Sequence, residues 1–250
     1  QGQQQEQQGS SDSSEPSTEP EEAPDDDDQV DTPLQPPVSQ DGILEMTGVG
    51  KEGGQYLSQN GVYLYNRTGK SLDESVFSAG MVHFTLGEGP QILILHTHGS
   101  EAYSQSDGLT YQESDSYRTT DCTRNMVRVG EEMAQIFREN GFEVIHDTNL
   151  YDYPAYNGAY ERSCAGVEKW LEQYPTIKLV LDVHRDALVG TEGTIYKTVA
   201  GTVDDCAQIM LVVGSDAGGQ AHDNWRQNLS LAVGIQQKVQ DSYGTLIRPI

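Results

Sequence analysis

The chain has 250 residues and a formal net charge of −24, from 39 acidic and 15 basic side chains. This balance argues against a nucleic-acid partner, because phosphate backbones bind basic surfaces. The sequence also contains no apolar run of roughly eighteen residues, the length that a membrane-spanning helix needs.

The first segment, residues 1–41, is almost wholly polar. Its first forty residues contain eleven Asp or Glu and no Lys or Arg. Such a composition cannot bury a core, so we predict a disordered acidic linker, and the rest of the chain still carries a charge of about −13. Because the chain begins with Gln rather than Met, we expect it to continue upstream to a membrane anchor.

Residues 42–88 are rich in Gly and contain the short runs GVYLYN and MVHFTL. These runs alternate as strands or hairpins do. We interpret this part as an adaptor segment beside a main domain that spans residues 89–250.

The main domain alternates apolar strand patterns with helical patterns. QILIL, FEVIH and KLVLDV read as strands, and helices are expected between them, the first from about Thr123 to Asn140. Further strands are expected at TIYKTVA and QIMLVVG, followed by a helix marked by Leu231, Ile235 and Val239. This alternation predicts an α/β fold with a mainly parallel sheet and helices on both faces.

Histidines follow two of these strands, at His96-Thr97-His98 and at His184-Arg185-Asp186. Ligands of open α/β sheets collect beyond the carboxyl ends of the strands, so both clusters should meet at one edge. A single histidine at the end of a strand is more often a hydrogen-bonded polar residue than a metal ligand. Two clusters at equivalent positions predict a divalent metal, most simply a zinc ion with three protein ligands and one open position.

Three motifs, HTHGSEAY, YRTTDCTRNMVRVGEEMA and LDVHRD, resemble the stage II sporulation protein P family. The resemblance covers roughly residues 92–250. It implies a zinc amidase-like fold and hydrolysis of the N-acetylmuramoyl-L-alanine bond of peptidoglycan during engulfment. A second activity on the stem-peptide crosslinks is also implied, so the preference between amidase and endopeptidase cleavage stays open.

The resemblance further implies a ligand set of His98, Asp121 and His184. His96 is the alternative to His98, or a residue that supports it. The general amidase pattern has Glu where this chain has Asp121, and Glu101 is therefore the competing third ligand.

Amidases supply their general base as a Glu near the end of the domain, whereas this sequence has no Glu after Glu192. Glu101 or Glu192 would have to replace that base, and Glu101 is our candidate. Arg185 is a second candidate for the chemistry, either orienting substrate or binding Asp186. Because the chain stops at LIRPI, we expect the catalytic domain to be truncated at its C-terminal end.

The loop after the first histidine cluster contains Tyr103, Tyr111 and Tyr117, which would line a groove for glycan or peptide or would simply be exposed. The resemblance implies an extracytoplasmic location, membrane-anchored at the sporulation septum. It also implies as partners a lytic transglycosylase and a membrane protein of the engulfment complex. The alternative function is a non-catalytic module that binds murein as a scaffold of that complex.

Overall fold

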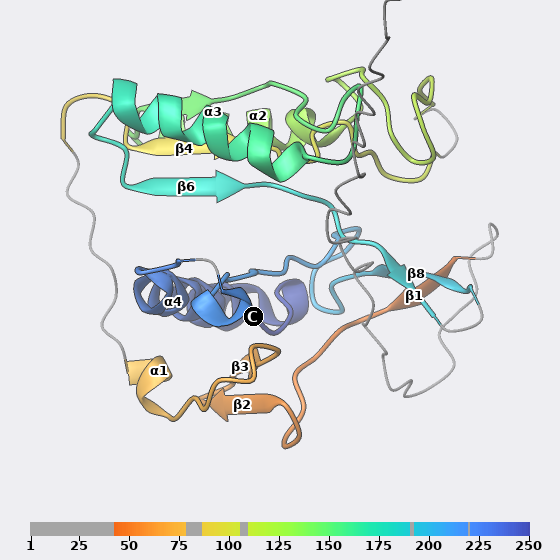
Figure 1. Cartoon of the computed structure of the whole chain (residues 1–250). Coiled ribbons are helices and arrows are strands. Elements are labelled where there is room, and N and C mark those ends of the chain that lie inside the picture. Colours follow the sequence, from red (N-terminus) through yellow and green to blue (C-terminus); the bar gives the residue numbers. More distant parts are fainter. Residues whose placement is uncertain (1–42, 79–86, 106–109, 191–192, 220) are drawn as a thin grey trace, which may run out of the picture.

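The computed structural model of the chain describes residues 43–78, 87–105, 110–190, 193–219 and 221–250 (Figure 1). The predicted linker at 1–41 and the predicted strand in MVHFTL lie outside the described residues.

A three-stranded parallel sheet holds the strands that precede both histidine clusters. Strand β4 (Ile92–Leu95) lies in the middle, between β5 (Val144–His146) and β6 (Leu179–Asp182). Ile92 is in register with the first residue of each neighbour. The predicted parallel arrangement of QILIL, FEVIH and KLVLDV is therefore confirmed.

Helices cover both faces of this sheet. Side chains of a strand alternate between its faces, and both faces of β4 are buried. One pair of β4 side chains packs with Ala134 of helix α2 (Met126–Glu139), and the other pair packs with Trp170 of helix α3 (Ala159–Gln173). The two pairs are Ile92 with Ile94, and Leu93 with Leu95. This arrangement explains why QILIL is apolar at successive positions.

The remaining strands form two smaller sheets. Strand β1 (Leu44–Met46) pairs in parallel with β8 (Ile195–Thr198), which pairs antiparallel with β7 (Leu188–Val189). Strands β2 (Tyr56–Gln59) and β3 (Val62–Tyr65) form a hairpin. The segment interpreted as an adaptor thus contributes three of the described strands, and the first of them, β1, pairs with β8 from the C-terminal part of the chain.

Helix α4 (Trp225–Tyr243) is drawn between the central sheet and the β2–β3 hairpin in Figure 1. It packs against β3 and against the short helix α1 (Ser75–Ser78). Single 3₁₀ turns occur at Asp216–Gly218, termed η1, and at Gly244–Leu246, termed η2. Val62, Leu64, Val76, Leu229 and Val233 form the buried cluster between these elements.

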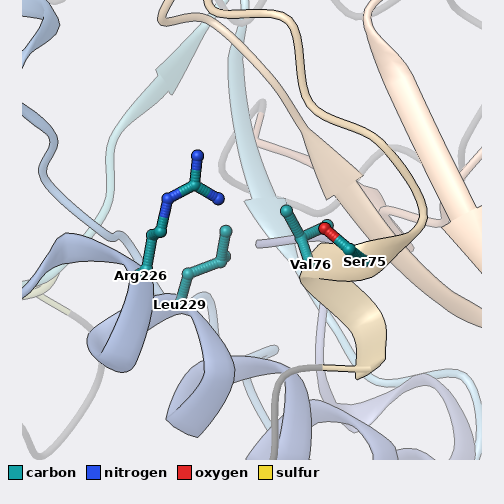
Figure 2. Close-up of a pocket in the computed structure, with 4 residues that line it drawn as sticks. All are labelled: Ser75, Val76, Arg226 and Leu229. Carbon is teal, nitrogen blue, oxygen red and sulfur yellow. The ribbon is translucent and has the colours of Figure 1, made fainter.

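A small hollow of about 130 Å³ lies at the edge of this cluster. Figure 2 shows Ser75 and Val76 of α1 on one side of it and Arg226 and Leu229 of α4 on the other. These four side chains include no His, Cys, Asp or Glu that could bind a metal ion or act as a base beside Ser75. We therefore interpret the hollow as a packing feature.

Two buried glutamines tie the adaptor segment to the C-terminal part of the chain. Gln236 of α4 accepts a hydrogen bond from Tyr63 N (3.2 Å) and donates one to Arg248 O (2.8 Å). Gln208 bonds both the N and the O of Gly48. Buried amides are stable only when they are bonded, so these side chains hold distant segments in one arrangement.

One expectation of secondary structure is wrong and two are confirmed. QIMLVVG forms no strand but a single bridge from Ile209 to Ile247, and Val212 is 80% exposed. The strand expected in TIYKTVA is confirmed as β8, which pairs with β1 outside the central sheet. The last expected helix is confirmed as α4, which buries Leu229, Ala232, Val233 and Gln236, while Leu231, Ile235 and Val239 are half-buried. Among the described residues, no helix combines the length and apolar character needed to cross a membrane.

Candidate functional site

Loops from all three strands of the central sheet meet at its carboxyl edge. His98 and Glu101 follow β4, Asp152 follows β5, and His184 and Arg185 follow β6. This is the edge where an open parallel sheet gathers its ligands. The site is therefore assembled by the sheet topology, as the histidine positions predicted.

The two predicted histidine ligands lie beside each other. The ring centroids of His98 and His184 are 5.3 Å apart, with the planes inclined by 65°. His184 Nε2 lies 3.1 Å from Asp182 Oδ2, which leaves Nδ1 as its remaining ring nitrogen. His98 is buried, and its Nδ1 has no hydrogen-bond partner among the residues that the structure describes.

Asp152 supports this part of the site from the loop after β5. Its carboxylate is fully buried and accepts hydrogen bonds from Ser100 N (3.1 Å) and Ser100 Oγ (2.6 Å). The same carboxylate lies 4.0 Å from His98 Nδ1, too far for a hydrogen bond but close enough to attract a positive ring. Asp152 thus fixes the loop that carries His98.

Glu101 is a buried carboxylate between two arginines. A backbone bridge pairs Glu101 with Arg118, and its Oε1 lies 3.5 Å from Arg118 Nη2. The other oxygen, Oε2, is buried and has no partner within the described ranges. Burial raises the pKa of Glu101, while the nearby charges of Arg185, His184 and Arg118 oppose this rise.

Aromatic rings form one wall beside His98. Tyr156 stacks on His98 with 4.6 Å between ring centroids and 14° between planes, and Tyr160 meets the same ring edge-on at 5.3 Å. The Arg118 guanidinium lies 4.9 Å from the centre of the Tyr156 ring. A cation over an aromatic face is attracted by the ring quadrupole, so Tyr156 helps to position Arg118.

The pKa values of the two histidines are shifted in opposite directions because their surroundings differ. Burial lowers the pKa of His98, and the positive charge of His184 acts in the same direction. Burial also acts to lower the pKa of His184, but the hydrogen bond and charge of Asp182 prevail and raise it. Thr97 holds Asp182 in place, donating to Oδ1 from N (2.8 Å) and to Oδ2 from Oγ1 (2.6 Å).

His96 faces a different side of the sheet and belongs to a separate buried cluster. Its Nδ1 donates to Val183 O (2.8 Å), and its Nε2 lies 3.0 Å from His146 Nε2. His146 Nδ1 in turn lies 2.9 Å from Glu131 of α2. Burial lowers the pKa of His96 to about 4. The ring therefore supports the peptide before His184 and lies away from His98.

The structure does not bring Asp121 to the histidines. Its carboxylate is exposed in the loop before α2 and accepts hydrogen bonds from Thr123 N (2.9 Å) and Thr123 Oγ1 (2.7 Å). Over the described ranges, no three His, Cys, Asp or Glu side chains are grouped as they would be around a metal ion. The assignment of Asp121 as a ligand stays a prediction.

Arg185 does not bind Asp186 in the structure. Asp186 pairs with Arg248 instead, whereas Arg185 Nε is buried and finds no partner in the described part of the chain. Of the loop tyrosines, Tyr103 and Tyr117 are exposed, and Tyr111 Oη donates to Tyr103 O (2.9 Å). The groove expected along them stays a prediction.

Asp152 and Arg118 were missed by the sequence analysis. Asp152 carries a usable signal, because it follows the third strand of the same sheet and the carboxyl-edge rule applies to that loop as well. Arg118 carries none, since its position depends on a loop that folds back to pair with Glu101.

Comparison with known proteins identifies one relationship. The family model for stage II sporulation protein P (SpoIIP) matches residues 1–250. No significant match to a curated protein or to a solved structure was found. The family acts in engulfment during sporulation and is associated with peptidoglycan hydrolysis. With the whole chain matched, the protein belongs to the stage II sporulation protein P family.

Proposed function

We propose that this protein is a zinc-dependent peptidoglycan hydrolase that cuts the N-acetylmuramoyl-L-alanine amide. The main support is the pairing of His98 with His184 at the carboxyl edge of the sheet, 5.3 Å apart, beside a buried carboxylate. Family membership supplies the substrate class.

Two buried atoms support a zinc site, although His98, His184 and Glu101 are not grouped at ligand distances within the described ranges. His98 Nδ1 and Glu101 Oε2 are buried polar atoms with no hydrogen-bond partner in the part of the chain that the structure describes, and such atoms are costly unless a ligand completes them. Two imidazoles and one carboxylate are a common ligand set of hydrolytic zinc. We therefore propose His98, His184 and Glu101 as ligands, because Glu101 lies with the histidines and Asp121 bonds Thr123.

The protein's own residues would orient these ligands. Asp182 holds His184 through Nε2, and Thr97 holds Asp182 with two hydrogen bonds. A carboxylate behind a ligating histidine fixes its tautomer and orientation. When bound, zinc would supply a water acidified to near neutral pH and would polarise the scissile carbonyl.

Zinc content of single variants tests this proposal. We expect His98→Ala and His184→Ala to lose stoichiometric zinc, and the exposed His222→Ala to retain it as the matched control. Glu101→Gln and Asp121→Asn, measured in parallel, identify the third ligand. The zinc site is refuted if both histidine variants still bind one equivalent.

The bond that is broken tests the activity. Mass spectrometry of digested murein separates amidase products from those of crosslink endopeptidase cleavage. A non-catalytic scaffold would instead sediment with murein whether or not a chelator is present, and would release no peptide.

The setting of the activity is part of the proposal and rests on family membership. We propose an extracytoplasmic location, anchored to the membrane at the sporulation septum. The proposed partners are a lytic transglycosylase and a membrane protein of the engulfment complex. Co-purification from sporulating cells after crosslinking would test both contacts.

A further inference from the structure

We infer that Arg118 and Arg185 bind a free carboxylate of the peptide part of the substrate, beside the His98–His184 pair. The identity of that substrate as a murein stem peptide rests on the proposed function. The inference itself rests on unsatisfied positive groups within the site.

The two guanidiniums have more hydrogen-bond capacity than the protein satisfies. Each carries a buried Nε without a partner among the described residues. Arg118 Nη2 lies 3.5 Å from Glu101 Oε1, and Arg185 directly follows His184 at the carboxyl edge of the sheet. A carboxylate of the substrate would supply the partner that each Nε lacks.

Arg118 is held in a fixed orientation rather than free in solvent. The backbone bridge to Glu101 sets its position, and the Tyr156 ring lies under its guanidinium at 4.9 Å. Tyr156 also stacks on His98, so Arg118 and the proposed metal ligand contact the same ring. An anion bound by Arg118 would therefore lie next to the reacting centre.

A carboxylate fits these groups best. The planar guanidinium presents parallel donors that match the two oxygens of a carboxylate. The chain as a whole carries −24, so an acidic peptide needs local positive charge to be attracted to the site at all. Murein stem peptides carry free carboxylates a few bonds from the amide that is cut.

Binding of two synthetic peptides tests the inference without requiring turnover. Both are N-acetyl-L-alanyl-γ-D-glutamyl-L-lysine, one with its carboxylates free and one with them converted to amides. Titration calorimetry on the full chain should show the acid binding at least about tenfold more tightly, the loss expected when a charge-assisted hydrogen bond is removed. Equal affinities would overturn the inference.

Variants then assign the preference to the two arginines. Arg118→Gln and Arg185→Gln should each reduce it, and Arg128→Gln, which removes an exposed arginine from α2, should leave it unchanged. Thermal melting establishes that each variant is folded. If Arg118→Gln does not fold, Arg185→Gln alone tests the assignment. A preference that survives in both folded variants contradicts the assignment, as does displacement of the acid peptide by an equal concentration of inorganic phosphate.

The same titration separates this inference from the proposed hydrolase. It is repeated with chelator and with His98→Ala. If zinc binding fails but the preference for the acid peptide persists, the carboxylate site stands and the hydrolase proposal falls. If zinc binds and the two peptides bind equally, the hydrolase stands and the carboxylate site falls.

Discussion

Replacing Gly130 of helix α2 with Ala tests the buried histidine cluster behind the site. A Cβ at Gly130 would lie 2.3 Å from His96 Nε2 and 2.6 Å from His146 Nε2, both closer than nonbonded atoms approach. Neither ring can move cheaply, because His96 is fully buried and bonded to Val183 O, and His146 is bonded to Glu131. The added methyl group therefore has to displace a hydrogen-bonded pair.

The size and sign of the effect follow from two opposing terms. Overpacking of a rigid core costs about 1–3 kcal/mol. Gly→Ala in a helix interior gains about 1 kcal/mol. Because the added methyl group would clash with two rings, we expect the overpacking term to exceed the gain in helix propensity. The free energy of unfolding should then fall by about 1–2 kcal/mol.

Urea unfolding followed by circular dichroism would measure this change. Gln135→Ala is the matched control, since it changes an exposed position of the same helix and should alter stability by less than about 0.5 kcal/mol. A Gly130→Ala protein that unfolds at the same or higher urea concentration than the wild type would refute the packing described here.

Three further measurements address individual groups. His96 has a pKa of about 4 when folded and about 6.5 when unfolded, so only the unfolded state takes up its proton as pH falls between these values. In chelated protein His96 alone should lower the free energy of unfolding by about 2 kcal/mol from pH 7 to pH 5. Urea unfolding of His96→Asn should therefore lack a contribution of about that size that the wild type shows. Asn at position 152 cannot accept both hydrogen bonds that Ser100 donates to Asp152. In Asp152→Asn the zinc affinity, measured against a competing dye, should therefore fall about tenfold or more. An unchanged affinity would count against the supporting role of Asp152. Asp147→Ala removes the acceptor of Tyr151 Oη and Trp170 Nε1. It should destabilise the fold by about 2–3 kcal/mol in unfolding followed by fluorescence. In the wild type, burial and Asp147 raise the pKa of Tyr151 to about 12, and ultraviolet titration should show this tyrosine ionising near that pH.

The central sheet could be predicted from sequence because its signal is strong and local. A strand buried on both faces must be apolar at every position, and QILIL meets that requirement. QIMLVVG is similarly apolar, yet among the described residues it forms a bridge only at Ile209 and one further backbone bond, from Gln208 N to Thr198 O. The apolar composition of a segment indicates that it can form a buried strand. Whether a neighbouring strand is available to pair with it depends on the tertiary structure.

The site divides in a similar way. His98 and His184 could be placed because both follow strands of one sheet and the topology brings them together. Asp121 was implied by the resemblance alone and stays a prediction, because in the structure it bonds Thr123, while Asn125 caps α2 and bonds Thr119 O. The position of a side chain in an irregular loop such as this one cannot be predicted from a periodic sequence pattern.

The pairing of β1 with β8 sets an order of events during synthesis. Thr47 donates to Val199 O across 152 residues of chain, and Tyr63 and Tyr65 bond the backbone of Ile250. Ribosomes add roughly 5–20 residues per second, so β1 waits on the order of 10–30 s for its partner. The central sheet, whose strands all lie between these two ends, can close during that interval. Strand β1, which is synthesised before the central sheet, is therefore paired after that sheet can close, and a chain released early would leave β1 without β8.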